Sequence, residues 1–343
     1  MTRAAWRVLG LLLAAGCATT GPTISRPEFE AAQAVVRAKA LRFRYAQAIR
    51  IQTVGMRLLE ALPATARAGS TPYVGIIVAA SGNDVGHAFG VPMEVVTGQV
   101  GSRHGVVITG VVAGGPADRA GLRTGDVLVR IGSQLIWSPA DAVAALRRQT
   151  PSTTIPVAVD REGARLTVLL TIGTKPYPVA FQLVAEGRGA EVWNAWAAPG
   201  SVTVTSRLLA FLQSDDELAV VLGHELAHLT SGHLAKGLGT SVVGSVLGSA
   251  IWRVTGIEVL ADMANGAVQS GFSRDFEREA DYVGLHYVAR AGYDMTAAPA
   301  LWERVATQLP RSAAIPWLTT HPSDPERMLR LQKAVEEIRA SGP

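Results

Sequence analysis

Apolar residues recur every three or four positions through residues 218–229, and a run of acidic residues stands directly before them. A period near 3.6 predicts an amphipathic helix. The acids Asp215, Asp216 and Glu217 offer an N-cap and negative charge in the first turn, and Gly232 and Gly237 mark its end. A second helix is expected to start near Ser273. Further helices are expected at residues 27–62, 297–308 and 324–340.

Short strand patterns separated by glycine turns occupy the middle of the chain. Residues 106–112 are an apolar run rich in valine, and residues 201–205 alternate β-branched side chains after the turn Pro199-Gly200. These patterns predict a strand and a hairpin. Length and composition allow about two domains, with a boundary in the Ala/Gly/Ser/Thr-rich residues 63–72. The fold class expected is α+β.

The most informative motif is His224-Glu225-Leu226-Ala227-His228, which lies inside the first predicted helix. Positions i and i+4 share a helical face, so both imidazoles can reach one tetrahedral cation while Glu225 points toward its open position. The alternative is a chance HExxH on a core helix. The motif predicts one Zn²⁺ per chain, with His224 and His228 as ligands and Glu225 as the catalytic base.

One protein ligand remains to be found. His233 follows His228 by five residues, so on a continuing helix it would face away from the metal, and we interpret it as a capping or ligand-supporting residue. Glu277 is the better candidate, because the helix beginning near Ser273 would place it on one face with Asp281. Asp281 would orient a ligand histidine by accepting its N–H. The alternative is that Glu277 and Asp281 simply face solvent, as acidic pairs on helices usually do.

His321, followed by a proline, is the last candidate in this region. Proline disfavours helix at the preceding residue, so His321 is expected on a loop before the final helix. Its imidazole could donate to the oxyanion of a tetrahedral intermediate, or could cover the zinc when substrate is absent. Arg327 is a further supporting candidate. A surface histidine and an arginine paired with nearby acids are the alternatives.

The segments NAWAAPGSVTVTSRLLAFLQSDDELAVVLGHELAHLTSGH, FSRDFEREAD and THPSDPER, in this order, resemble the gluzincin metallopeptidases that include CAAX prenyl endopeptidases, HtpX and BepA. The resemblance covers about residues 178–335. It implies a mostly helical peptidase domain over residues 178–343, with a small edge β-sheet and zinc ligands His224, His228 and Glu277. It also implies a substrate-pairing edge strand at Asn194, Ala195, Trp196 and Ala197; an edge strand blunted by the protein's own loops is the alternative.

Residues 72–173 resemble a PDZ domain, a small β-sandwich or barrel-like fold, on the pattern of strand, GGPADRAGLRTGD and second strand. The resemblance implies that Tyr73, Val74, Gly75 and Ile76 form a loop that captures a peptide's C-terminal carboxylate. Tyr73 and Val74 could equally be core residues of a first strand. Residues 51–62 resemble the helix that opens the peptidase domain in this family. Residues 26–65 are therefore expected to belong to the peptidase, with the PDZ domain inserted into it.

The N-terminus has the pattern of a secretory signal. Arg3 and Arg7 precede the apolar run of residues 8–15, which is too short for a stable membrane span. Cys17 is the only cysteine, which excludes an internal disulfide framework. Leu13-Ala14-Ala15-Gly16-Cys17 resembles a bacterial lipobox, so residues 1–17 are expected to be a lipoprotein signal peptide with Cys17 lipidated. Ala18 favours the periplasmic face of the outer membrane; an ordinary signal peptide is the alternative.

The formal net charge of +4 falls to +2 once Arg3 and Arg7 are removed, so no nucleic-acid partner is indicated. Residues 237–252 are uncharged and rich in Gly, Ser and Val, and are interpreted as a flexible hairpin or lid, or as a shallow membrane contact. The function expected is a zinc endopeptidase of the bacterial cell envelope, acting on misfolded or regulated proteins, with a PDZ domain that recognises free peptide C-termini. The rival is a PDZ-bearing scaffold or chaperone whose chemistry is dispensable.

Overall fold

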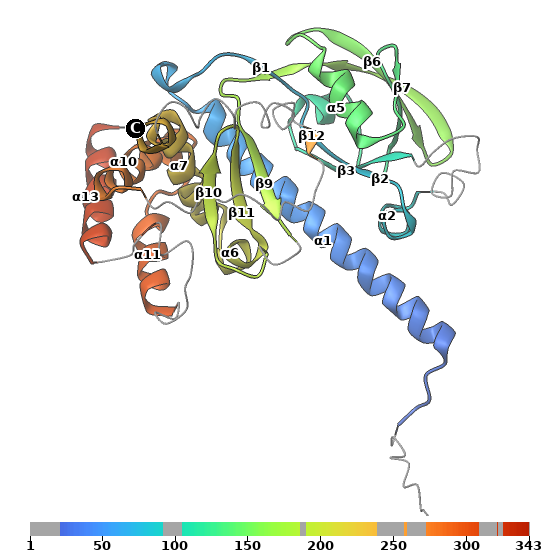
Figure 1. Ribbon diagram of the computed structural model, residues 1–343, viewed down its shortest axis with the longest axis horizontal. Helices are drawn as coiled ribbons and strands as arrows, with labels where there is room; N and C mark the ends of the chain where they lie inside the picture. The colour runs from blue at the N-terminus through green and yellow to red at the C-terminus, as the bar shows by residue number, and fades with distance from the viewer. Residues whose placement is uncertain are drawn as a thin grey trace, which may run out of the picture.

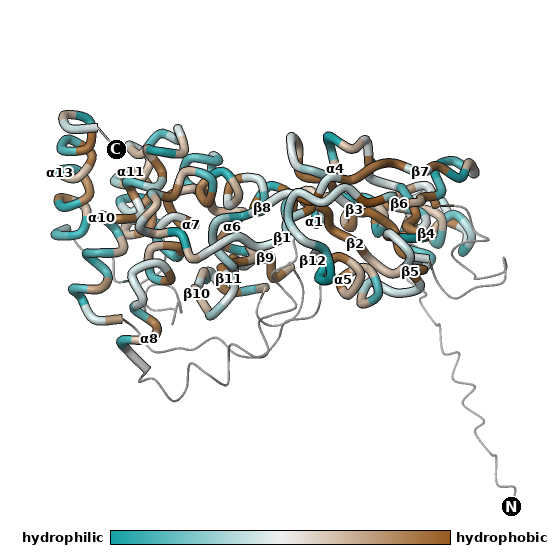
Figure 2. Tube along the Cα trace, turned by 90° about the horizontal axis from the view of Figure 1, so that it is seen from above, coloured by the Kyte–Doolittle hydropathy of each residue, from teal (hydrophilic) through white to brown (hydrophobic). Residues whose placement is uncertain are grey.

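The computed structural model describes residues 21–91, 105–185, 190–238, 257–258, 272–308, 321 and 325–342. Cys17 and the expected signal peptide lie outside these residues, as does the Gly/Ser-rich stretch from residue 239 onward. The arrangement is α+β, as predicted. Two lobes lie side by side, one built mainly of helices and the other around a sheet (Figure 2).

The long helix α1 (Arg26–Glu60) joins the two lobes (Figure 1). Ser25 caps it, since its hydroxyl accepts from the Glu28 N–H while the Glu28 carboxylate accepts from the Ser25 N–H. The C-terminal half is buried, with Ile51, Leu58 and Leu59 fully covered in the larger hydrophobic core. The N-terminal half projects away from that core (Figure 1).

The sheet lobe is the expected PDZ-like region. Its strands lie in the order β12-β2-β3-β4-β6-β7, with β5 paired to β4. The elements are β2 (Ile76–Ala80), α2 (Asn83–Phe89), β3 (Val106–Val111), α4 (Pro116–Arg119), β4 (Val127–Ile131), β5 (Gln134–Leu135), α5 (Pro139–Arg147), β6 (Thr154–Arg161), β7 (Ala164–Thr171) and β12 (Ile257–Glu258). Valine, isoleucine and leucine side chains of these strands and of α5 form a separate core.

The PDZ-like lobe begins and ends at neighbouring strands. The strand β1 (Thr71–Tyr73) pairs antiparallel with β8 (Gly173–Lys175), so the chain enters and leaves the lobe at one place. Helix α1 comes before this pair, and the other elements of the helical lobe follow it. Because α1 packs in the core of the helical lobe, the PDZ-like lobe lies between two segments of the chain that share that core.

The helical lobe holds a three-stranded sheet in the order β10-β11-β9. The turn at Gly200, whose φ is 80°, joins β10 and β11 as the predicted hairpin, and β11 runs parallel to β9. The elements are η1 (Ala64–Ala66), β9 (Ala180–Val184), β10 (Ala195–Ala198), β11 (Ser201–Thr205), α6 (Ser206–Phe211), α7 (Asp215–Thr230), α8 (His233–Leu238), α10 (Arg274–Arg290), α11 (Ala297–Gln308) and α13 (Pro325–Ser341). Within the described residues, no helix is both long enough and apolar enough to cross a membrane.

Candidate metal centre

Helix α7 carries the HExxH motif in the centre of the helical lobe. Its N-cap is Ser214, whose side chain accepts from the Glu217 N–H, and not one of the three acids expected there. The acids occupy the first turn, where Glu217 forms a buried ion pair with Arg304 instead. Ser214 takes the cap position because its short hydroxyl reaches the N3 amide while its backbone is extended. The helix buries both faces, so the motif residues are removed from bulk water.

Helix α10 lies directly against α7 and brings the second motif to the first. It begins after Ser273, which caps the Phe276 N–H, as the sequence indicated. A Cβ built on Gly284 would lie 2.9 Å from the carbonyl carbon of Gly223. The two helix backbones therefore touch one residue before His224, and a side chain on either glycine would separate the motifs.

Four candidate ligand atoms converge where the helices meet. His224, His228, Glu277 and His321 are all buried, and their ligand atoms lie within 4.8 Å of one another. The Nε2 atoms of His224 and His228 are 3.1 Å apart, and His228 Nε2 lies 3.3 Å from Glu277 Oε1. Ligands about 2.0–2.2 Å from a tetrahedral Zn²⁺ are about 3.3–3.6 Å apart. The spacing and the N/O donor set fit zinc.

Buried oxygens without hydrogen-bond donors lie at the same place. Both carboxylate oxygens of Glu225 and Oε1 of Glu277 have no hydrogen-bond partner within the described part of the chain. Glu225 is 1% exposed, so its carboxylate is also shielded from bulk water. A buried unpaired carboxylate is costly unless a cation compensates it. The arrangement is that of a cation site with a carboxylate beside it.

Asp281 holds the far side of the His224 ring. Its Oδ1 lies 2.9 Å from His224 Nδ1, which leaves Nε2 of that ring for a metal. Arg327 binds Asp281 through two bonds, of 2.8 Å from Nε and 2.6 Å from Nη2. The guanidinium carbon of Arg327 lies 3.6 Å from the ring centroid of buried Trp302. This chain of contacts fixes the tautomer and the orientation of His224.

His321 lies inside the ligand cluster. Its Nδ1 is 2.8 Å from Glu277 Oε2 and 3.1 Å from His224 Nε2, while its Nε2 is 3.3 Å from Glu225 Oε1. The side chain is 3% exposed. The alternative of a surface histidine is therefore wrong, because His321 folds back onto the two helices.

His233 is placed by a break in the helix that the sequence analysis did not use. The expectation that it faces away assumed a continuing helix, but α7 ends at Thr230 and Gly232 has a φ of 69°. The turn returns His233 toward α7, where its Nδ1 lies 3.0 Å from His228 Nδ1. His233 thus contacts the back of a candidate ligand and does not approach the ligand cluster itself.

Two phenylalanines that the sequence analysis missed pack on these rings. Phe272 stacks on His228 with ring centroids 3.9 Å apart, and Phe276 stacks on His233 at 4.3 Å. Phe272 lies just before α10 and Phe276 lies in its first turn. This end of the helix therefore contributes apolar walls as well as Glu277. Their only sequence signal is their place beside the acidic motif. Gly223, Gly284 and Trp302 gave no signal either, because their roles depend on which helices touch.

Burial and neighbouring charges shift the pKa values of the candidate ligands in different directions. Burial lowers the pKa of His228 to about 3. Burial opposes the charged form of His224 too, but its bonds to Asp281 and Glu277 outweigh this and raise its pKa to about 9. For Glu277, burial would raise the pKa, yet contacts with the three histidines hold it well below its usual range. A cation bound here replaces the proton on His224.

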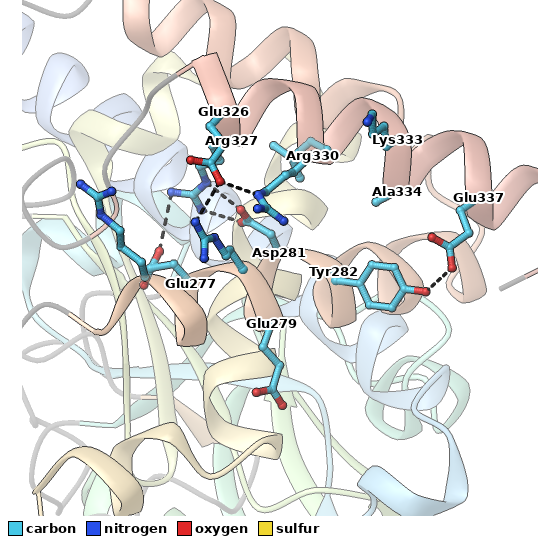
Figure 3. A pocket seen from close by; sticks show the side chains of 13 residues that line it. Glu277, Glu279, Asp281, Tyr282, Glu326, Arg327, Arg330, Lys333, Ala334 and Glu337 are labelled. Atoms are coloured by element: carbon cyan, nitrogen blue, oxygen red, sulfur yellow. Dashed lines mark hydrogen bonds and ion pairs between the residues drawn. The ribbon is translucent and has the colours of Figure 1, made fainter.

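A cavity of about 410 Å³ lies behind the centre, between α10 and α13 (Figure 3). Glu277, Asp281 and Arg327 face it from the metal side, and Tyr282 bonds Glu337 at its far end (Figure 3). Glu326 of α13 pairs with Arg278 of α10 and with Arg330 of its own helix. Opposite charges are thus matched along its wall, so the cavity has no marked preference for one sign of ligand.

The predicted substrate strand is β10, at the edge of its sheet. Asn194 lies just before it, and Ala195, Trp196 and Ala197 lie within it, which shifts the expected bounds by one residue. The strand packs against α7, the helix that carries the HExxH motif.

The predicted carboxylate loop joins β1 to β2. Tyr73 ends β1 and packs in the core of the helical lobe, whereas Val74 and Ile76 pack in the PDZ core. Gly75 has a φ of 81°, and a Cβ there would lie 2.9 Å from Tyr73 Oη. Among the described residues, the N–H groups of Val74 and Gly75 donate to no backbone carbonyl. The side chains of Tyr73, Val74 and Ile76 are thus core residues.

The outer edge of β2 is paired with another part of the chain. Ile257 and Glu258 form β12, which runs parallel to β2 in register with Ile76 and Ile77. These two residues come from the segment between α8 and α10. The connection between the metal-site helices thus reaches the PDZ lobe.

Comparison with known proteins agrees with this geometry. The sequence pattern of peptidase family M48 matches residues 159–335, and that of a PDZ domain matches residues 107–161. The mitochondrial metalloendopeptidase OMA1 of Arabidopsis thaliana is 34% identical over 41% of this chain and 29% of its own length. The putative beta-barrel assembly-enhancing protease of Vibrio cholerae is 32% identical over 39% of this chain and 31% of its own length.

Among solved structures, the HtrA-type protease AlgW with decapeptide is 25% identical, with a TM-score of 0.27, over 31% of this chain and 30% of that one. The chain spans between 29% and 44% of the length of the OMA1 relatives. The M48 match, in contrast, covers more than half of the chain and includes both helices of the candidate centre. The chain therefore belongs to peptidase family M48 and also carries a PDZ domain.

Proposed function

We propose that the protein is a zinc-dependent endopeptidase of the bacterial cell envelope that cleaves misfolded or regulated envelope proteins. The observation that carries this proposal is the buried cluster of His224, His228 and Glu277 with the unpaired carboxylate of Glu225 beside it. His224, His228 and Glu277 would hold one Zn²⁺. When bound, the cation supplies Lewis-acid polarisation of the scissile carbonyl and of the attacking water.

The protein's own residues would do the proton chemistry and the positioning. Glu225 takes the proton of the attacking water and delivers it to the leaving amine. Its carboxylate makes no hydrogen bond among the described residues, and the nearest ring nitrogen, His321 Nε2, lies 3.3 Å away. Asp281 and Arg327 keep the His224 ring in one tautomer. Phe272 covers His228 and helps to exclude water.

His321 would cover the centre when substrate is absent. Its Nδ1 lies within reach of both His224 and Glu277, and its Nε2 faces Glu225, so it fills the space in which a water and a carbonyl would react. Substrate binding then has to move His321. After such a movement the same imidazole could donate to the oxyanion, which was the other role expected for it.

The substrate backbone would pair with the outer edge of β10. An edge strand offers unpaired N–H and C=O groups, and an extended peptide can add to it as a further strand. Trp196 and its neighbours in β10 lie beside α7, so a peptide added there would run past Glu225. Main-chain pairing of this kind accepts many sequences, which suits the removal of damaged proteins.

The PDZ domain would bind a free peptide C-terminus. The backbone N–H groups of Val74 and Gly75 are the candidate donors to the carboxylate, and β2 with α5 would form the groove. Because β12 pairs with the same edge of β2, such a ligand has to displace Ile257 and Glu258.

A lipid anchor at Cys17 would hold the protein at the periplasmic face of the outer membrane. The lipobox-like sequence before Cys17 supports the anchor. The match to beta-barrel assembly-enhancing proteases, which are bacterial, supports an envelope location. The position of Ala18 after the cysteine favours the outer membrane over the inner one.

A scaffold or chaperone function is the second candidate, and the position of His321 favours it, because a centre that stays covered would not turn over. The test is zinc content and casein cleavage by residues 18–343, which retain every described residue, beside Glu225→Gln. Cleavage by the parent, with zinc bound but cleavage lost in the variant, supports the peptidase. Zinc in both without cleavage supports the scaffold. Absence of zinc in both overturns the ligand assignment.

A further inference from the structure

The N-terminal half of α1 carries a row of solvent-exposed apolar side chains. Phe29 is 57% exposed, and Val36 and Phe43 are each 65% exposed. The three are seven residues apart, so they lie on one side of the helix, and the exposed Ala32 and Ala40 lie on that side between them. Helix α1 extends beyond both lobes in this half (Figure 1).

The opposite side of the same half-helix is already covered. Ala38 is 5% exposed and Tyr45 is 6% exposed, and the Tyr45 ring contacts Phe89 of α2 with centroids 5.5 Å apart. Arg37 pairs with Asp84 of the same helix α2. The PDZ lobe thus packs on one side of α1, and the Phe29/Val36/Phe43 stripe faces the other way.

Basic residues accompany the stripe. Residues 26–44 contain Arg26, Arg37, Lys39, Arg42 and Arg44 against two acids, Glu28 and Glu30. A helix with an apolar stripe, a Lys/Arg-rich polar side and low overall hydropathy is suited to the surface of a bilayer that contains anionic lipid. Cationic groups that flank the stripe, such as Arg26 and Lys39, would meet the phosphates while the apolar side chains enter the headgroup boundary.

The stripe is poorly suited to a coiled coil with a second copy. A coiled-coil seam needs large apolar residues at two positions in every heptad, the first and the fourth. If the stripe occupies the first position, the fourth falls on Ala32, Lys39 and Ala46, which are two small side chains and a charged one. The helix thus has large apolar side chains at only one of the two heptad positions. Such a single row suits a flat surface better than the groove of a second helix.

We propose that residues 26–44 of α1 lie on the surface of an anionic lipid bilayer, with Phe29, Val36 and Phe43 inserted. The proposal extends the proposed envelope location and uses its anchor. Cys17 is nine residues before Arg26, and nine residues reach at most about 30 Å. A lipid on Cys17 would therefore keep this half-helix close to the bilayer.

The test is co-sedimentation of residues 18–343 with vesicles of phosphatidylcholine alone or with one quarter phosphatidylglycerol. The parent should bind the anionic vesicles, and Phe29→Gln/Val36→Gln/Phe43→Gln should bind at least tenfold more weakly. Glutamine keeps the helix propensity, and these exposed sites need no repacking. Leu169→Gln/Leu329→Gln is the control, since these leucines are 68% and 58% exposed elsewhere.

Zinc content and casein cleavage, measured without vesicles, should be the same in the parent, the triple variant and the control. Equal vesicle binding by parent and triple variant would overturn the proposal, as would no binding by the parent. A parent that self-associates in sedimentation velocity, with a monomeric triple variant and no vesicle binding, would assign the stripe to a second copy. Vesicle binding and sedimentation velocity do not depend on turnover, so the proposed peptidase can fail while this proposal stands.

Discussion

The backbones of Gly223 and Gly284 are in contact where α7 and α10 pack together. A Cβ on Gly284 would lie 2.9 Å from the Gly223 carbonyl carbon and 2.9 Å from the His224 nitrogen. This contact lets two helices from distant parts of the chain place His228 and Glu277 within 3.3 Å. Neither glycine belongs to a recognised motif, yet both decide whether the motifs meet.

Gly284→Ala should destabilise the protein and weaken zinc binding, because the added methyl meets backbone that cannot move aside. Overpacking of this kind costs about 1–3 kcal/mol. Gly223→Ala should act in the same direction but less strongly, since its Cβ would meet the Gly284 carbonyl oxygen at 3.0 Å. Thermal unfolding and zinc content measure both effects. An unchanged melting temperature and full zinc content in Gly284→Ala would contradict the close contact.

Asp281→Asn should lower zinc affinity by about ten- to a hundredfold, because a residue that orients a metal-binding histidine has an effect of this size. The asparagine also leaves Arg327 without its charged partner. Competition with a chromophoric zinc chelator gives the affinity. Tyr282→Phe, which removes a surface bond to Glu337 from the next residue of α10, is the matched control and should bind zinc like the parent. Equal affinity in Asp281→Asn would remove Asp281 from the support of His224.

His321→Ala should retain zinc and cleave casein faster than the parent. Three candidate ligands remain in the variant, and the space that His321 fills between Glu225 and Glu277 becomes open to substrate. Steady-state cleavage and zinc content are measured together. A fall in kcat with zinc retained would instead assign His321 to the oxyanion, where loss of a donor costs about a hundred- to a thousandfold.

Ile257→Pro/Glu258→Pro should increase the affinity of the PDZ domain for peptide. Proline has no N–H to donate to a strand partner, so β12 should no longer pair with β2. The edge of β2 would then be open to peptide without competition from β12. The probe is a fluorescein-labelled hexapeptide ending in Trp-Val with a free carboxylate, followed by fluorescence anisotropy. Its C-terminal amide is the control and should bind weakly to both proteins. Equal affinity for parent and variant would show that β12 does not compete.

The local elements could be read from the sequence because they depend on neighbouring residues. The spacing of apolar residues in 218–229 predicted α7, and Ser273 indicated the start of α10. The turn Pro199-Gly200 predicted the hairpin of β10 and β11. The expected N-cap was wrong, because Ser214 takes that position in place of the acids. His233, expected to cap the helix or support a ligand, contacts His228 because the chain turns at Gly232.

The sequence by itself determined the chemistry: two histidines and a glutamate at helical spacing, a carboxylate motif downstream, and a PDZ pattern that precedes both. Only the tertiary structure decided that Gly223 meets Gly284, that Arg327 rests on Trp302 and binds Asp281, and that β12 joins the PDZ edge. Spacing along one helix is fixed by covalent geometry and local hydrogen bonds. Contacts between distant segments depend on the packing of whole faces, which no local pattern records.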